Sequence, residues 1–238
     1  MLSSSTAILF CLVVLAVALA VVVGLRRAGA GVRPLLAILF AYIAIPGHLA
    51  RTGGLGGWNA TPPPPLALIL GLTALTALIV FSAVGTRMAD GIPLAAIVLL
   101  QSFRIAVEWL LHRLYLEGTV PVQMTWSGRN FDVVTGVTAL LLGLALLRGR
   151  QVPRALVLGW NVLGIALLAN IVIVAVLSTP ALHRFPDQPP NLLPSAFPWV
   201  WLPSFLVQVA LGSHLLVFRR LRRTGAVGAA ASAAGSAR

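Results

Sequence analysis

The chain has 238 residues, of which 59% are hydrophobic and only 9% are charged, and its mean hydropathy is +0.98. Soluble domains carry about 25% charged residues, so this composition excludes an ordinary soluble protein and indicates an integral membrane protein. The net charge of +12 comes from 17 arginines and no lysine. These arginines lie between hydrophobic runs, which argues against a nucleic-acid partner and favours the positive-inside rule.

Seven hydrophobic runs follow one another along the chain, and a run of about 20 apolar residues is enough to cross a bilayer. We therefore predict an all-α membrane protein, a single domain over residues 1–223 with a bundle of about seven transmembrane helices. The second run is short and is interrupted by Pro46 and Gly47, so it has the weakest support among the seven. The predicted spans are 6–25, 34–49, 66–85, 92–116, 132–147, 155–177 and 199–218.

The arginines predict the orientation of these spans. Twelve arginines fall in one set of loops and in the C-terminal tail, whereas only Arg51, Arg129 and Arg184 fall in the opposite loops. Under the positive-inside rule the N-terminus lies outside and the C-terminus is cytoplasmic, which requires an odd number of spans. Residues 224–238 are rich in Ala, Gly and Ser, and we expect a disordered cytoplasmic tail there.

The fourth run carries polar side chains where a lipid-facing helix would be apolar. At roughly 100° per residue, five of them fall within an arc about 80° wide and form one stripe, which we expect to face a protein interior or a watery cavity. Arg104 and Glu108, and likewise Glu108 and His112, are four residues apart, so each pair is expected to be in contact. The stripe consists of Gln101, Arg104, Glu108, His112 and Tyr115.

Three residues outside this run complete the predicted pocket in the outer half of the bundle. They are Asn130 and Asp132, near the start of the fifth run, and Gln208 in the seventh. Asp132 also suits the first turn of a helix, where a carboxylate opposes the helix dipole. Asn161 and Asn170 lie on different faces of the sixth run and are each expected to bond a neighbouring helix.

Cofactor binding has little support in the sequence, and we predict none. A weak alternative is a b-type haem held by His48 and His112, the histidines that fall at matching depths. No metal-binding or nucleotide-binding motif occurs, and without a lysine the chain cannot hold a retinal Schiff base.

Three stretches resemble a family of uncharacterised bacterial multi-pass membrane proteins. They are Gln101-Ser102-Phe103-Arg104 with Val107-Glu108, the segment from Met124 to Asp132, and Phe197-Pro198-Trp199-Val200-Trp201-Leu202-Pro203. The resemblance implies a shared seven-helix fold in the bacterial inner (cytoplasmic) membrane and places these motifs at the outer ends of helices.

The leading functional hypothesis is a transporter-like or sensor-like protein whose polar pocket binds a small molecule or an ion. One alternative is a membrane-embedded enzyme that acts on a lipid or anionic headgroup, with Glu108 and His112 as acid and base and Arg104 as the anion-binding group. Another is an accessory subunit whose polar stripe contacts a membrane-protein partner. We expect the protein to contact the lipid bilayer, and we expect no nucleic-acid partner.

Overall fold

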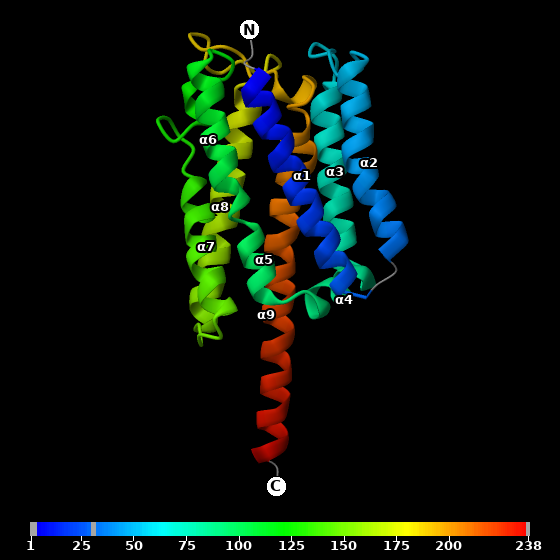
Figure 1. Cartoon of the computed structure of the whole chain (residues 1–238), viewed down its shortest axis with the longest axis vertical. Coiled ribbons are helices and arrows are strands. Elements are labelled where there is room, and N and C mark those ends of the chain that lie inside the picture. The colour runs from blue at the N-terminus through cyan, green and yellow to red at the C-terminus, as the bar shows by residue number, and fades with distance from the viewer. Residues whose placement is uncertain (1–3, 30–31, 237–238) are drawn as a thin grey trace.

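All regular elements in the described part of the chain are helices (Figure 1). The computed structural model describes residues 4–29 and 32–236, apart from the side chains of 32, 33 and 224–236. This confirms the predicted all-α bundle. The α-helices are α1 (Ser4–Arg27), α2 (Val32–Arg51), α3 (Pro64–Phe81), α4 (Ala83–Gly91), α5 (Leu94–Leu100), α6 (Phe103–Leu116), α7 (Val133–Leu147), α8 (Arg154–Leu177) and α9 (Val207–Ser236).

Six helical segments are long and apolar enough to cross a membrane. Four of them are α1, α3, α8 and most of α2 (residues 34–51). The fifth, residues 94–116, comprises α5, α6 and the turn between them. The sixth, residues 202–223, comprises the short π-helix η3 (Leu202–Leu206) and the first part of α9. The fifth predicted span corresponds to α7, an apolar helix of 15 residues. It runs alongside α8 in the bundle (Figure 1). The described residues therefore contain six helical segments of full crossing length and a shorter seventh.

The two ends of the bundle differ in character. The start of α1 and the longer connections, 52–63, 117–132 and 178–201, lie at the end we call the loop end (Figure 1). The opposite, arginine-rich end carries α4, the α7–α8 connection and the exit of α9. Arg26, Arg27 and Arg87 lie there, as do the arginines of residues 148–154 and 219–223. The predicted charge asymmetry thus coincides with a structural one, and the assignment of the loop end to the outside stays a prediction.

The fourth predicted span is broken rather than continuous. α5 ends at Leu100 and α6 begins at Phe103, with Gln101 and Ser102 in a turn between them. Through the break the backbone hydrogen bonds become i→i+3, from Arg104 N to Gln101 O and from Ile105 N to Ser102 O. The predicted span over 92–116 nevertheless corresponds to one helical segment of crossing length, Leu94–Leu116. Hydropathy records this apolar run but carries no information about the local change of backbone pitch at Gln101 and Ser102.

Helix α7 packs closely against both halves of this broken span. A Cβ atom on Gly136 would lie 2.8 Å from Ile105 Cγ1 of α6, and one on Gly143 would overlap the Leu99 side chain of α5. Ala139, between the two glycines, is fully buried. These three residues form the small-residue face that the sequence indicates for helix contact, and their size lets the backbones approach.

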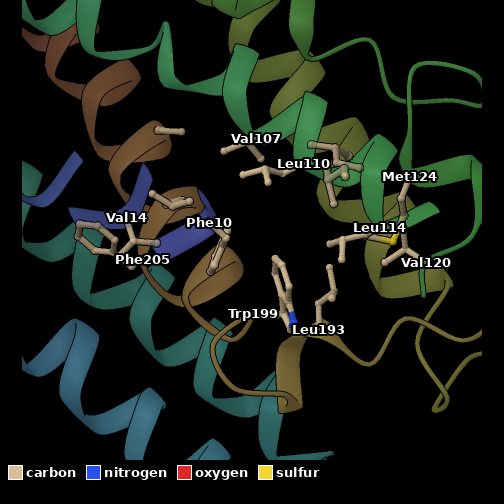
Figure 2. Close-up of a cluster of buried hydrophobic side chains, with 14 of the residues drawn as sticks. Phe10, Val14, Val107, Leu110, Leu114, Val120, Met124, Leu193, Trp199 and Phe205 are labelled. Carbon is tan, nitrogen blue, oxygen red and sulfur yellow. The ribbon is translucent and has the colours of Figure 1, made fainter. Parts of the chain in front are cut away.

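A hydrophobic cluster fills the loop end of the bundle (Figure 2). Its centre is Trp199, in the segment before η3, whose ring centroid lies 4.8 Å from that of Phe10 on α1. Leu193 from the third long connection and Leu114 from α6 join it. All four side chains are almost fully buried, so the loop segment 191–201 is part of the core and closes this end of the bundle.

Arginines of α9 tie the arginine-rich end together. Arg219 donates hydrogen bonds to the carbonyls of Val80 and Ser82 at the end of α3, and to Thr86 Oγ1. Arg220 donates to Ala89 O over 2.9 Å at the end of α4. Cationic side chains at helix C-termini satisfy carbonyls that lack an intrahelical partner. These arginines therefore stabilise the fold in addition to marking its sidedness.

The backbone of α9 stays helical to Ser236, whereas the sequence predicts a disordered tail from residue 224. The side chains of 224–236 and all of residues 237–238 lie outside the described residues. The disordered tail therefore remains a prediction.

Candidate functional site

Arg104 on α6 forms a buried ion pair with Asp132, the residue that precedes α7. Its Nε lies 2.5 Å from Asp132 Oδ2, and its Nη2 donates to Asp132 Oδ1. This two-point geometry matches the planar guanidinium to the carboxylate. The two side chains are only 2% and 7% exposed, so bulk solvent reaches neither charge and each depends strongly on the other.

The same guanidinium reaches a third and a fourth helix. Arg104 Nη1 lies 3.0 Å from His214 Nε2 on α9, and 3.5 Å from the carbonyl oxygen of Gly164 on α8. Because a guanidinium only donates, His214 Nε2 must accept, which places the imidazole proton on Nδ1. Nδ1 then donates to Asn161 Oδ1 over 2.8 Å, and Asn161 Nδ2 donates back to His214 O. The protonation pattern is thus self-consistent, with a neutral histidine.

Glu108, one turn further along α6, has a different partner. Nδ2 of Asn130 lies 2.7 Å from both carboxyl oxygens of Glu108 and also donates to Met124 O. The amide oxygen of Asn130 accepts from the backbone N–H of Asp132, at 3.1 Å. Asn130 therefore links Glu108 to the start of α7, and through Asp132 to Arg104. Together Glu108, Asn130, Asp132, Arg104, His214 and Asn161 form what we call the polar network.

The network differs from the contacts that helical spacing predicts. Arg104 was expected to pair with Glu108, but in the described residues its ion pair is with Asp132. Glu108 was expected to touch His112, but its recorded hydrogen bonds come from Asn130. Helical spacing did not identify Asp132 as the ion-pair partner of Arg104, because a side chain four residues away offers a weak surface interaction, whereas Asp132 offers a bidentate one in a buried setting.

His112 and Tyr115, the outer members of the stripe, lie apart from the network. The His112 ring stacks on Trp126 at a centroid separation of 4.4 Å, and Tyr115 packs at 5.9 Å. Both residues are half-buried. With Trp126 of the 117–132 connection they form an aromatic group, separate from the charged residues.

The two glutamines of the predicted pocket are also separated from Arg104. Gln101, in the turn between α5 and α6, donates through Nε2 to Ala210 O on α9 over 2.9 Å. Gln208 belongs to a second polar group, in which its Oε1 accepts from Thr76 Oγ1, which also lies 2.9 Å from the Tyr42 hydroxyl. The predicted single pocket is therefore divided into separate polar groups.

A small cavity adjoins the network. It has a volume of about 90 Å³ and is lined by Arg104, Glu108 and Asp132, together with mainly apolar side chains of α3, α6, α8 and α9. Its lining extends to Thr179 and Asn191 at the loop end. A volume of this size has room for a few water molecules, and the three charged groups provide polar partners for them.

His214 and Asn161 are the members of the network that the sequence interpretation did not place in the pocket. Asn161 was expected to bond a neighbouring helix, and its hydrogen bond to His214 O on α9 confirms this. His214 was not among the predicted site residues. One feature of α8 that could have indicated a close contact near Asn161 is a glycine. Gly164 lies three residues after Asn161, and a Cβ there would overlap the His214 ring, so a glycine is needed where the imidazole crosses.

The described residues contain no group of three or more His, Cys, Asp or Glu side chains arranged to hold a metal ion. His48 is exposed on α2, and α2 and α6 lie on opposite sides of α1 (Figure 1). His112 is engaged with Trp126. The fold therefore gives no support to the His48–His112 haem alternative.

Comparison with known proteins gives one match. Residues 62–222, which include the whole polar network, match a family model described as a domain of unknown function (DUF8737). No curated protein and no solved structure shows significant similarity to the chain. Since the matched region is more than half of the sequence, this helical membrane protein belongs to the DUF8737 family.

Proposed function

We propose that the protein binds a proton at Glu108 from the adjoining cavity, in a transporter-like or sensor-like role. The observation that carries this proposal is the charge balance of the buried network. It contains two carboxyl groups, Glu108 and Asp132, against the single guanidinium of Arg104, whose ion pair is with Asp132. Within the part of the chain that the structure describes, the hydrogen bonds to the Glu108 carboxyl group come from the Asn130 amide.

An ionised Glu108 would be a buried charge without a counter-ion of its own. Burial of an unpaired charge is far more costly than burial of a neutral group that can form hydrogen bonds. Glu108 is 1% exposed and lines an apolar-walled cavity, which favours the neutral carboxylic acid when Asp132 is ionised. A carboxyl group that gains and loses a proton inside a membrane is a common element of proton-linked transport and sensing.

Protonation of Glu108 would change the hydrogen bonds of Asn130 and, through them, the contacts at the start of α7. The ionised carboxylate uses both oxygens to accept from Asn130 Nδ2, whereas the neutral acid keeps one acceptor and offers an O–H to the cavity. Asn130 also accepts from Asp132 N, so a shift of its side chain reaches the Arg104 pair. The other charged groups of the polar network are Arg104 on α6 and Asp132 at the start of α7, and its imidazole is that of His214 on α9.

The infrared spectrum of the purified protein tests the proposal. At neutral pH the wild type should show the carbonyl band of a protonated carboxylic acid, and Glu108→Gln should lose it. Asp187→Asn, which changes an exposed carboxylate of a long connection, is the matched control and should keep the band. A spectrum without this band, or a band that survives in Glu108→Gln, would contradict the proposal.

The enzyme alternative receives less support from the geometry. An anionic headgroup that bound Arg104 would have to displace the two-point contact with Asp132, and the adjoining cavity of about 90 Å³ is small for a headgroup. A bound proton requires neither change. For this reason proton binding, rather than headgroup chemistry, is the function we propose.

A further inference from the structure

A second and larger cavity lies in the arginine-rich half of the bundle. Its volume is about 670 Å³, within the range of pockets that hold drug-sized ligands. Side chains of α1, α2, α3, α5 and α9 form its walls, and Phe103 is the one residue that also lines the small cavity beside the polar network. The two cavities are therefore distinct, and the larger one has no part in the proposed proton site.

The walls of this cavity are suited to hydrocarbon. Most lining side chains are aliphatic, such as Val17, Ile38 and Leu100. The polar group of Tyr42, Thr76 and Gln208 also lines it, but these side chains satisfy one another by hydrogen bonds of 2.9 and 3.2 Å. Because these polar atoms already have hydrogen-bond partners, a ligand need not supply any, and an apolar chain can lie against them.

The cavity is open along α1. Ala16, Ala20 and Arg27 all line it, and all three are exposed. They lie one below another toward the C-terminal end of the helix, so the opening runs from the hydrophobic part of α1 to its charged end. In a bilayer this opening would face lipid, and an apolar void of this size beside lipid tails would lose dispersion contacts if it stayed empty.

The positive charge at the opening of the cavity favours a lipid with an anionic headgroup. Arg27 lines the cavity and Arg26 precedes it, and the whole arginine-rich end has Asp90 as its one acidic residue among the five in the sequence. Asp90 is already paired with Arg223. An anionic headgroup at Arg27 would meet little competition from carboxylates, and basic sites between membrane helices favour such headgroups.

From this combination we infer that the large cavity binds an anionic phospholipid of the bilayer, with its headgroup at Arg27 and an acyl chain between α1, α2, α3 and α9. The phosphate is recognised by the guanidinium and the chain by the aliphatic walls. The lipid thereby fills a wide gap in the packing of the arginine-rich half.

Native mass spectrometry of the delipidated full-length protein tests this site. We expect the wild type to retain one phosphatidylglycerol in preference to phosphatidylcholine of the same chain length. Ala20→Phe projects a ring into the cavity and should weaken phosphatidylglycerol binding about tenfold, which corresponds to about 1.4 kcal/mol. The matched control is Ala67→Phe, which adds the same ring to an exposed position of α3 and should leave binding unchanged.

Arg27→Gln separates the headgroup contact from the chain contact. It changes an exposed side chain at a helix end, so the fold should be unaffected, and it should reduce the preference for phosphatidylglycerol about fivefold. Equal retention of the two phospholipids by the wild type would overturn the inference, as would undiminished binding in Ala20→Phe. Stronger retention of oleic acid than of phosphatidylglycerol would overturn the assignment to a bilayer phospholipid. The Glu108 infrared band reports the proton site independently of either result.

Discussion

Removal of one member of the Arg104–Asp132 pair should destabilise the protein far more than removal of both. Arg104→Leu leaves Asp132 as a buried charge, and Asp132→Asn leaves Arg104 with His214 and the Gly164 carbonyl as its partners. Neither substitution lets solvent reach the remaining charge, because both side chains are less than a tenth exposed. The double substitution leaves no uncompensated charge at this position.

The expected magnitudes follow from the burial of the pair. Loss of one partner of a buried ion pair costs about 3–5 kcal/mol, whereas replacement of both is often close to neutral. Here the double substitution also removes the hydrogen bond from Arg104 to His214, which adds about 1.5–3 kcal/mol to the cost. We therefore expect the double variant to be no less stable than either single one, and a coupling energy of at least about 3 kcal/mol.

Unfolding free energies of the four proteins in lipid bicelles at neutral pH would give this coupling. A second cycle, with Arg104→Leu and Glu108→Gln, is the matched control, because helical spacing alone would put the ion pair there. It should give a much smaller coupling, since the recorded hydrogen bonds of Glu108 come from Asn130. If the Arg104–Glu108 cycle gave the larger coupling, the assignment of Asp132 as the partner of Arg104 would be refuted.

Two further predictions concern the packing and the orientation. Gly164→Ala places a Cβ against the His214 ring and should cost about 1–3 kcal/mol, whereas Gly159→Ala on the same helix meets nothing within 4 Å and should be neutral or stabilising, as thermal unfolding would measure. In a cysteine-free background, a cysteine at Ser127 should react with an impermeant thiol reagent on spheroplasts, while one at Gly149 should not; the reverse pattern would invert the predicted orientation.

Much of the fold could be predicted from hydropathy, because crossing a bilayer demands long apolar helices whatever their neighbours. The seven predicted spans correspond to the long helices and to α7. The turn at Gln101 and Ser102 could not be predicted, since neither glycine nor proline marks it. Its geometry depends on contacts far along the chain, such as the hydrogen bond from Gln101 to Ala210 O on α9.

The members of the site were easier to predict than their partners. Ionisable side chains inside apolar runs are costly, so Arg104 and Glu108 were recognisable from their position alone. Their partners depend on tertiary packing, and Asp132 lies 28 residues from Arg104 while His214 lies 110 residues away. Local spacing favours a neighbour on the same helix, and no single sequence records which helices meet.

The length of α7 has a consequence for the surrounding membrane. Its 15 residues span about 22 Å, roughly 8 Å less than a typical hydrocarbon core. Val134, Leu141 and Leu147 present apolar surface along the outside of this helix. Hydrophobic mismatch of this kind draws the two leaflets together around the short helix. The protein should therefore carry a locally thinned annulus of lipid on its α7 side, and its cost of insertion should depend on the acyl-chain length of the host membrane.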